Sequence, residues 1–116
     1  MRFLSFAAIA VVSVMAMSEA NAQAQQNFSL VNRSGTQIDE VYVSASSRSE
    51  WGRDILGDGV LPAGQRRNIT FPRGTRACNF DVKVVFTNGG NAEASNLNLC
   101  EITVITVTPN GRFATE

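Results

Sequence analysis

The most regular alternation of hydrophobic and polar positions lies in residues 79–86. Phe80, Val82, Val84 and Phe86 recur at every second position. A period of two predicts a β-strand with one buried face. We therefore take this strand as the centre of the fold.

A hairpin is expected directly after this strand. Residues 88–90 read Asn-Gly-Gly, which adopts positive φ readily, and a second extended segment then leads to Cys100. A three-residue loop centred on Gly89 would place Cys100 opposite Cys78, the other cysteine of the chain.

The same register sets Ala92 beside Phe86 and Ala94 beside Val84 on the inner face. A two-residue loop would instead turn Glu93 toward the core, where an unpaired carboxylate is costly. The sequence therefore favours the three-residue loop.

Further strands are expected at residues 28–31, 38–44, 65–71 and 101–108, separated by turns rich in Gly, Pro and Asn. In the second of these, Ile38, Glu40 and Tyr42 share one face and Val41 and Val43 the other, which favours a central place in a sheet. The tail from Phe113 is expected to be loose.

Short strands without an amphipathic helix predict an all-β fold, a small antiparallel β-sandwich that is immunoglobulin-like or similar. An open barrel is the second choice. Within the irregular stretch of residues 44–59, Trp51, Ile55 and Leu56 are expected to form a lid over one end of the core.

The first 22 residues predict a signal-peptide helix. Arg2 precedes an apolar run, and Ala20-Asn21-Ala22 fits the small-x-small cleavage pattern. The apolar run is too short to span a membrane. Cleavage near Ala22, or at the competing site Ala24, would leave one domain of residues 23–116, periplasmic or secreted and without a stable membrane anchor.

Cysteine and charge content limit the class of protein. Two cysteines in an exported chain predict one disulfide, Cys78–Cys100, which would stabilise the fold by about 3 kcal/mol. The chain carries ten basic and ten acidic residues and so has no net charge. This balance argues against a nucleic-acid partner.

Histidine is absent from the sequence. The chain therefore lacks Ser-His-Asp and Cys-His arrangements, His-ligated metals and any side chain that ordinarily titrates near neutral pH. Lys83, the only lysine, is expected to be a solvent-facing charge. We predict a protein that is not an enzyme and needs no cofactor.

One loop could hold a metal ion. Asp54 and Asp58 flank a glycine-containing turn, and two carboxylates with backbone carbonyls could bind calcium. The favoured alternative is that these carboxylates accept hydrogen bonds from N–H groups of the loop, while Gly57 and Gly59 take positive φ.

A possible binding surface includes Arg66, Arg67, Arg73, Arg76 and Trp51. The four arginines could hold a phosphate or an acidic polymer, although solvated charges guarding a strand edge are the favoured interpretation. Trp51 and Tyr42, the only residues of their types, could anchor a partner or a sugar, although core positions are favoured.

The chain also carries five short motifs, which are Asn-x-Ser-Gly at residues 32–35, Val-Tyr-Val-Ser at 41–44, Trp-Gly-x-Asp-x-Leu-Gly at 51–57, Cys-x-Phe-Asp-x-Lys-Val-Val at 78–85 and Asn-Leu-Cys-Glu at 98–101. With these motifs the sequence resembles a family of small exported bacterial proteins, some labelled twin-arginine signal protein or argininosuccinate lyase. The single Arg2 does not fit a twin-arginine signal, and the chain lacks the long helices and motifs of a lyase.

Together these features predict an exported, non-enzymatic binding or structural module of the bacterial envelope. Its partner would be an envelope or extracellular protein or ligand of unknown identity. The alternatives are a calcium-assisted binding domain that uses Asp54 and Asp58, and a secreted enzyme inhibitor that presents the loop of residues 44–58.

Overall fold

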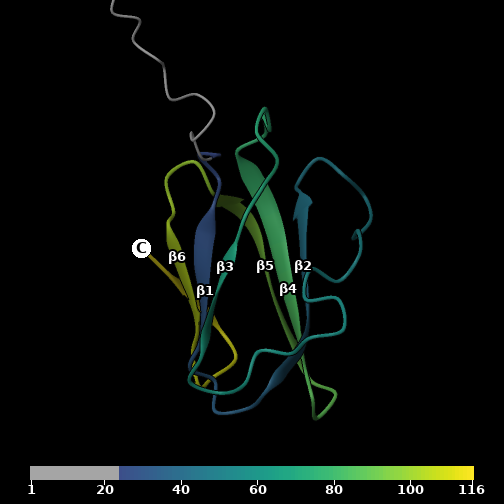
Figure 1. Ribbon diagram of the computed structural model, residues 1–116, viewed down its shortest axis with the longest axis vertical. Coiled ribbons are helices and arrows are strands. Elements are labelled where there is room, and N and C mark those ends of the chain that lie inside the picture. The colour runs from purple at the N-terminus through teal and green to yellow at the C-terminus, as the bar shows by residue number, and fades with distance from the viewer. Residues whose placement is uncertain (1–23) are drawn as a thin grey trace, which may run out of the picture.

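The computed structural model describes residues 24–116, which form two β-sheets packed against each other (Figure 1). The strands are β1 (Phe28–Asn32), β2 (Ile38–Ala45), β3 (Arg66–Ile69), β4 (Asn79–Phe86), β5 (Asn91–Asn98), β6 (Val104–Val107) and β7 (Phe113–Thr115). One sheet has the order β3-β1-β6-β7 and the other β2-β4-β5. The predicted all-β sandwich is confirmed, whereas the predicted signal-peptide helix lies outside the described residues.

The core lies between the two sheets. Leu30 and Ile105 of the four-stranded sheet and Val82 and Val84 of the three-stranded sheet are all fully buried. The alternation that predicted β4 is therefore the pattern of its buried face, because Phe80 and Phe86 are also buried.

Within residues 24–116 there is no helix long and apolar enough to cross a membrane.

One strand pair departs from the antiparallel arrangement. β1 runs parallel to β6, with Leu30 opposite Ile105, whereas the other pairs are antiparallel. Parallel neighbours need a long connection, and here most of the chain lies between the two strands (Figure 1).

The β4–β5 hairpin has a different register from the predicted one. Ala92 lies opposite Val84 and Ala94 opposite Val82, two positions away from the expected partners. The loop is centred on Asn88, because Gly89 (φ 92°) takes the last loop position. Three-residue hairpin loops place their positive-φ residue there, after a turn, and not at the centre. A shift of two residues keeps each side chain on its face, so Ala92 is still buried.

A bulge brings the cysteines together despite this shift. Between Phe80 and Val82 the pairing changes by one residue, so that Phe80 lies opposite Leu97. The extra residue is Asn96, which has positive φ (57°). Cys78 and Cys100 then form the predicted disulfide, with their Cα atoms 5.2 Å apart.

β2 is an edge strand, so its predicted central position is wrong. A second bulge, between Ile38 and Glu40, puts Ile38 and Val41 on the same buried face. The prediction failed because strict alternation assigned these two residues to opposite faces. The free side of β2 is covered in part by the following loop, since Ile55 N–H donates to the Val41 carbonyl (2.8 Å).

The C-terminal segment is also more ordered than expected. β7 pairs with β6, with Phe113 opposite Val107, and Phe113 packs against the core. The expectation of a loose tail is therefore wrong. Three residues are too few for a hydrophobic period to be recognised in the sequence.

Candidate binding face

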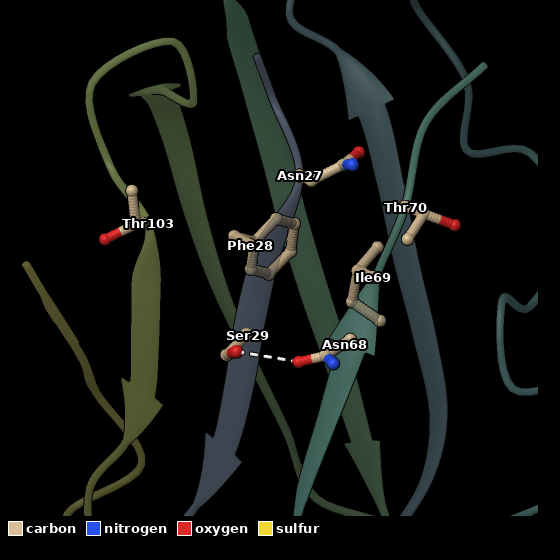
Figure 2. A pocket seen from close by; sticks show the side chains of 7 residues that line it. All are labelled: Asn27, Phe28, Ser29, Asn68, Ile69, Thr70 and Thr103. Carbon is tan, nitrogen blue, oxygen red and sulfur yellow. Dashed lines mark hydrogen bonds between the residues drawn. The ribbon is translucent and has the colours of Figure 1, made fainter. Parts of the chain in front are cut away.

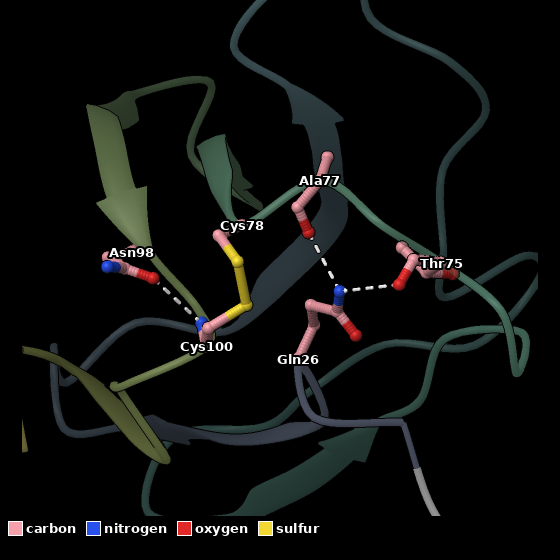
Figure 3. Close-up of a disulfide and its surroundings, with 6 residues drawn as sticks. All are labelled: Gln26, Thr75, Ala77, Cys78, Asn98 and Cys100. Atoms are coloured by element: carbon pink, nitrogen blue, oxygen red, sulfur yellow. Dashed lines mark hydrogen bonds between the residues drawn. A yellow bond between two sulfur atoms is a disulfide. The ribbon is translucent and has the colours of Figure 1, made fainter.

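The disulfide closes the base of the β4–β5 hairpin (Figure 3). The Cys100 N–H donates to Asn98 Oδ1 (3.0 Å), which turns the chain toward Cys78. Beside it, the buried side chain of Gln26 donates to the carbonyls of Thr75 (3.0 Å) and Ala77 (2.7 Å). The segment before β1 is thereby fixed to the segment that leads into β4.

Trp51 and Tyr42 lie on the outer side of the three-stranded sheet. Tyr42 is opposite Lys83, and their neighbours along the strands include the buried Val41 of β2 and the buried Val82 and Val84 of β4. The rings of Tyr42 and Trp51 are 6.3 Å apart between centroids, tilted by 51°. Both side chains are half-buried and neither belongs to the hydrophobic core. The favoured core positions for these aromatics are therefore wrong, and Trp51 is not part of the lid.

Lys83 joins the two aromatic rings. Its Nζ lies 5.8 Å from the centroid of Tyr42 and 6.0 Å from that of Trp51, within the range of cation–π attraction. Within residues 24–116 the Lys83 ammonium makes no hydrogen bond or ion pair. We call the surface formed by Tyr42, Trp51 and Lys83 the aromatic face.

The Tyr42 hydroxyl is held by a neighbour on the same strand. It donates to Glu40 Oε1 (2.5 Å). This hydrogen bond, together with partial desolvation and the negative charges of Glu40 and Asp54, raises the pKa of Tyr42 above its usual value. The bond fixes the ring where it meets Trp51.

Asp81 borders the aromatic face on β4. Its Oδ1 accepts hydrogen bonds from the Ser46 hydroxyl (2.7 Å) and the Asn96 N–H (3.0 Å). These two bonds, the Ser46 bond first, hold the pKa of Asp81 below its usual value. Asp81 is therefore a carboxylate that links β4 to β5 and to Ser46, the residue after β2.

A small cavity of about 110 Å³ lies between this carboxylate and the loop after β2. Its lining consists of Ser44, Arg48, Ser49, Glu50, Trp51 and Asp81. The loop is fixed at this point because the Ser44 hydroxyl donates to the Glu50 carbonyl (3.0 Å). Trp51 thus contributes to both the aromatic face and the cavity.

The rest of the loop is held against the sandwich. Asp54 Oδ1 accepts hydrogen bonds from the N–H groups of Val41 (2.8 Å) and Leu56 (3.0 Å). Leu56 is buried and Ile55 packs against the core, as the lid prediction expected. Gly57 takes positive φ (59°), as expected, whereas Gly59 does not.

Asp58 is exposed and makes no hydrogen bond within residues 24–116. Among these residues there is also no group of three or more acidic or cysteine side chains that could hold a metal ion. The alternative favoured from the sequence, that the carboxylates accept hydrogen bonds from backbone N–H groups, holds for Asp54, because its Oδ1 accepts two such bonds.

The arginines come from separate parts of the molecule. Arg66 and Arg67 lie on β3, an edge strand, and alternate between its two faces. Arg67 lies opposite Leu30 and reaches the loop at Gly59, where its Nη1 would be 3.8 Å from an added Cβ. Arg73 and Arg76 are exposed in the connection between β3 and β4. Trp51 lies in the loop after β2 and contacts Tyr42 of the other sheet, so the four arginines and Trp51 do not share one sheet.

Another cavity, of about 310 Å³, opens between the ends of β1 and β3 (Figure 2). It is lined by Asn27, Phe28, Ser29, Asn68, Ile69, Thr70 and Thr103. Several of its polar groups are already paired. The Ser29 hydroxyl donates to Asn68 Oδ1 (2.8 Å), and Asn27 Oδ1 accepts from the Phe71 N–H (2.7 Å). The lining of this cavity includes no charged side chain and neither Trp51 nor Tyr42.

Sequence reasoning missed two residues of the site, Asp81 and Lys83. The sequence did contain a pattern that could have indicated them, because both occupy outward-facing positions of β4, the strand with the clearest alternation. The polar half of that pattern marked the sheet face on which Tyr42 and Trp51 meet.

Comparison with known proteins supports the fold. No protein-family model matches the chain, and neither does any curated protein. Among solved structures, the chain is similar to one described as the NMR structure of the protein from Eubacterium rectale. The match has a TM-score of 0.55 and 10% identity, and covers 86% of this chain and 94% of the other. At this identity the likeness shows the fold alone. The resemblance to a family of small exported proteins stays a prediction.

Proposed function

We propose that this protein is an exported, non-enzymatic binding module of the bacterial envelope, and that the aromatic face is its binding surface. The observation that carries the proposal is the position of Trp51 and Tyr42. These are the only Trp and the only Tyr of the chain, and both lie outside the core.

Burying large aromatic rings is a strong stabilising contribution in a small domain. A fold that instead leaves both rings half-buried on a sheet surface gives up part of that stabilisation. Trp and Tyr are also enriched among the residues that dominate binding energy at interfaces. A binding role accounts for the placement of Trp51 and Tyr42 together.

Two features support the remaining parts of the proposal. The Cys78–Cys100 disulfide suits an oxidising compartment outside the cytoplasm. The sequence has no histidine, and Asp81, which borders the aromatic face on β4, has a lowered pKa. A carboxylate of this kind is a weak general base near neutral pH.

The test is retention of envelope components on the immobilised, oxidised protein, comparing wild type with Trp51→Ala and Lys83→Gln. We expect each substitution to reduce retention about tenfold, the scale of a residue that dominates a contact. Val60→Ala is the control, because Val60 is an exposed apolar side chain that does not line the cavity beside Trp51. Equal retention by all four proteins, each with an intact thermal transition, would refute the proposal.

A further inference from the structure

We infer that the aromatic face binds a sugar, specifically one uncharged pyranose ring, and that an edge of this ring enters the cavity beside Trp51. This inference rests on the proposed function and names its ligand class. It is argued from the ring faces, the hydrogen-bonding groups, the charges and the cavity size.

The rings provide the apolar part of the site. A pyranose has one face of C–H groups, which are weakly positive, and an aromatic face carries negative charge density. Trp51 and Tyr42 are tilted by 51° to each other, so they form an angle and not a flat platform, and Lys83 Nζ lies within 6.0 Å of both ring centroids. A sugar ring that rests on Trp51 would therefore also meet the Lys83 ammonium.

Both donors and acceptors lie near these rings. The Lys83 ammonium makes no hydrogen bond within the described residues, and neither does the Trp51 indole. In Asp81 both hydrogen bonds go to Oδ1, which leaves Oδ2 open. A hydroxyl both donates and accepts, so neighbouring hydroxyls of a sugar can meet an ammonium on one side and a carboxylate on the other.

Charges of both signs surround the cavity and the aromatic face. Arg48, Glu50 and Asp81 line the cavity, and Lys83, Glu40 and Asp54 lie near the Tyr42 ring. A polyanion would meet carboxylates here, and a polycation would meet the two basic groups. A neutral ligand with many hydroxyls avoids both penalties.

Cavity size sets how much of the ligand is enclosed. A volume of about 110 Å³ corresponds to three or four waters at about 30 Å³ each. This is enough for the edge of one ring and its exocyclic group, and too little for two rings. Recognition of a single sugar residue, with the rest of any chain in solvent, fits this volume.

Trp51 gives a direct readout, because it is the only tryptophan in the chain. The experiment titrates the full oxidised protein with glucose, galactose, mannose and N-acetylglucosamine, and follows Trp51 fluorescence and amide NMR shifts. We expect a saturable change with at least one sugar and a Kd on the order of 1 mM. The shifted amides should lie at residues 42–51 and 81–83.

Variants separate binding from folding. Arg48 and Ser49 line the cavity with exposed side chains. The substitutions Arg48→Gln and Ser49→Ala should therefore each weaken sugar binding several-fold. Asp81→Asn should weaken it about tenfold, although this change also touches the bulge. Val60→Ala is the matched control and should bind as wild type does.

Three results would overturn the sugar inference. The first is no saturable change up to about 100 mM, a hundredfold excess over the expected Kd. The second is that the amide NMR shifts occur at Ser29, Asn68 and Thr103, which line the cavity between β1 and β3, and not at the residues of the aromatic face. The third is binding of heparin that depends on Trp51, without binding of neutral sugars. If envelope retention still depends on Trp51 in these cases, the proposed function stands and the ligand is a protein or a polyanion.

Discussion

The carboxylate of Asp81 accepts a hydrogen bond from the N–H of Asn96, the non-glycine residue with positive φ in residues 24–116 (3.0 Å; φ 57°). Asn96 is the extra residue of the β5 bulge, and an unpaired N–H there would be left without a ladder partner. Asp81 supplies that partner and so stabilises the bulge that brings the cysteines together.

Asp81→Ala should therefore destabilise the fold by about 1–2 kcal/mol, because it removes the acceptor of two hydrogen bonds. The pKa of Asp81 is lowered in the folded state, so its contribution is present above the unfolded value near 4 and is lost as pH falls through the folded pKa. Urea unfolding at several pH values measures both effects. Asp81→Asn should flatten this acid dependence, and an unchanged dependence would contradict the assignment.

At Asn96 the effect of a substitution on stability should depend on whether the new residue tolerates positive φ. Asn96→Gly should be neutral or slightly stabilising, whereas Asn96→Val should cost about 1–2 kcal/mol, because a branched side chain is strained at positive φ. Chemical denaturation of the two variants gives the comparison. Equal stability of both would show that this backbone conformation is absent in solution.

Asn32 connects β1 to two other segments and is fully buried. Its Nδ2 donates to the carbonyls of Thr36 (2.9 Å) and Leu61 (3.0 Å), and its Oδ1 accepts from the N–H and hydroxyl of Ser34. Asn32→Asp keeps the shape but removes both donors, so we expect a loss of about 3 kcal/mol or more at neutral pH. Calorimetry tests this, with Asn110→Asp in an exposed turn as the control. A loss as small as that of the control would contradict the role.

Tyr42 is the only tyrosine, so its ionisation can be followed by ultraviolet absorbance alone. We expect a midpoint above 10, because the hydroxyl donates to Glu40. Glu40→Gln should move the midpoint back toward the usual value. Since the folded pKa is raised, the related stability is present below pH 10 and falls as pH rises through the folded pKa. A midpoint unaffected by Glu40→Gln would contradict the hydrogen bond.

Asp54 provides the test of the calcium alternative. Its Oδ1 already accepts two backbone N–H groups, so Asp54→Ala should destabilise the protein by about 1–2 kcal/mol even without metal. Calcium at millimolar concentration should leave the unfolding temperature unchanged, and Asp58→Ala should have little effect on stability. A calcium-dependent rise in unfolding temperature that Asp58→Ala abolishes would instead establish a metal site.

β4 was predicted best from the sequence. It has one buried face, and the extra residue of the β4–β5 bulge lies on β5, so strict alternation holds along the whole of β4. In β2 the extra residue at Asp39 breaks the alternation, and a bulge has no hydrophobic signature in the sequence. The parallel pairing of β1 with β6 is a matter of tertiary packing, which local patterns do not contain.

The candidate site was partly within reach of sequence reasoning. Trp51 was named as a possible anchor, yet the core was favoured for it because large aromatics usually lie inside. What the sequence could not supply was the path of the loop after β2, which brings Trp51 over Tyr42 and Lys83. That path depends on the hydrogen bonds of Ser44 with Glu50 and of Asp54 with Val41, which hydrophobic alternation does not reveal.

The parallel pairing of β1 also bears on the order in which the molecule can assemble. β1 lies between β3 and β6, and β6 begins only at Val104. The β4–β5 hairpin can close locally, whereas the first strand waits for a neighbour some seventy positions downstream. A chain that emerges with its N-terminus first therefore cannot complete the four-stranded sheet until the residues of β6 and β7 are free.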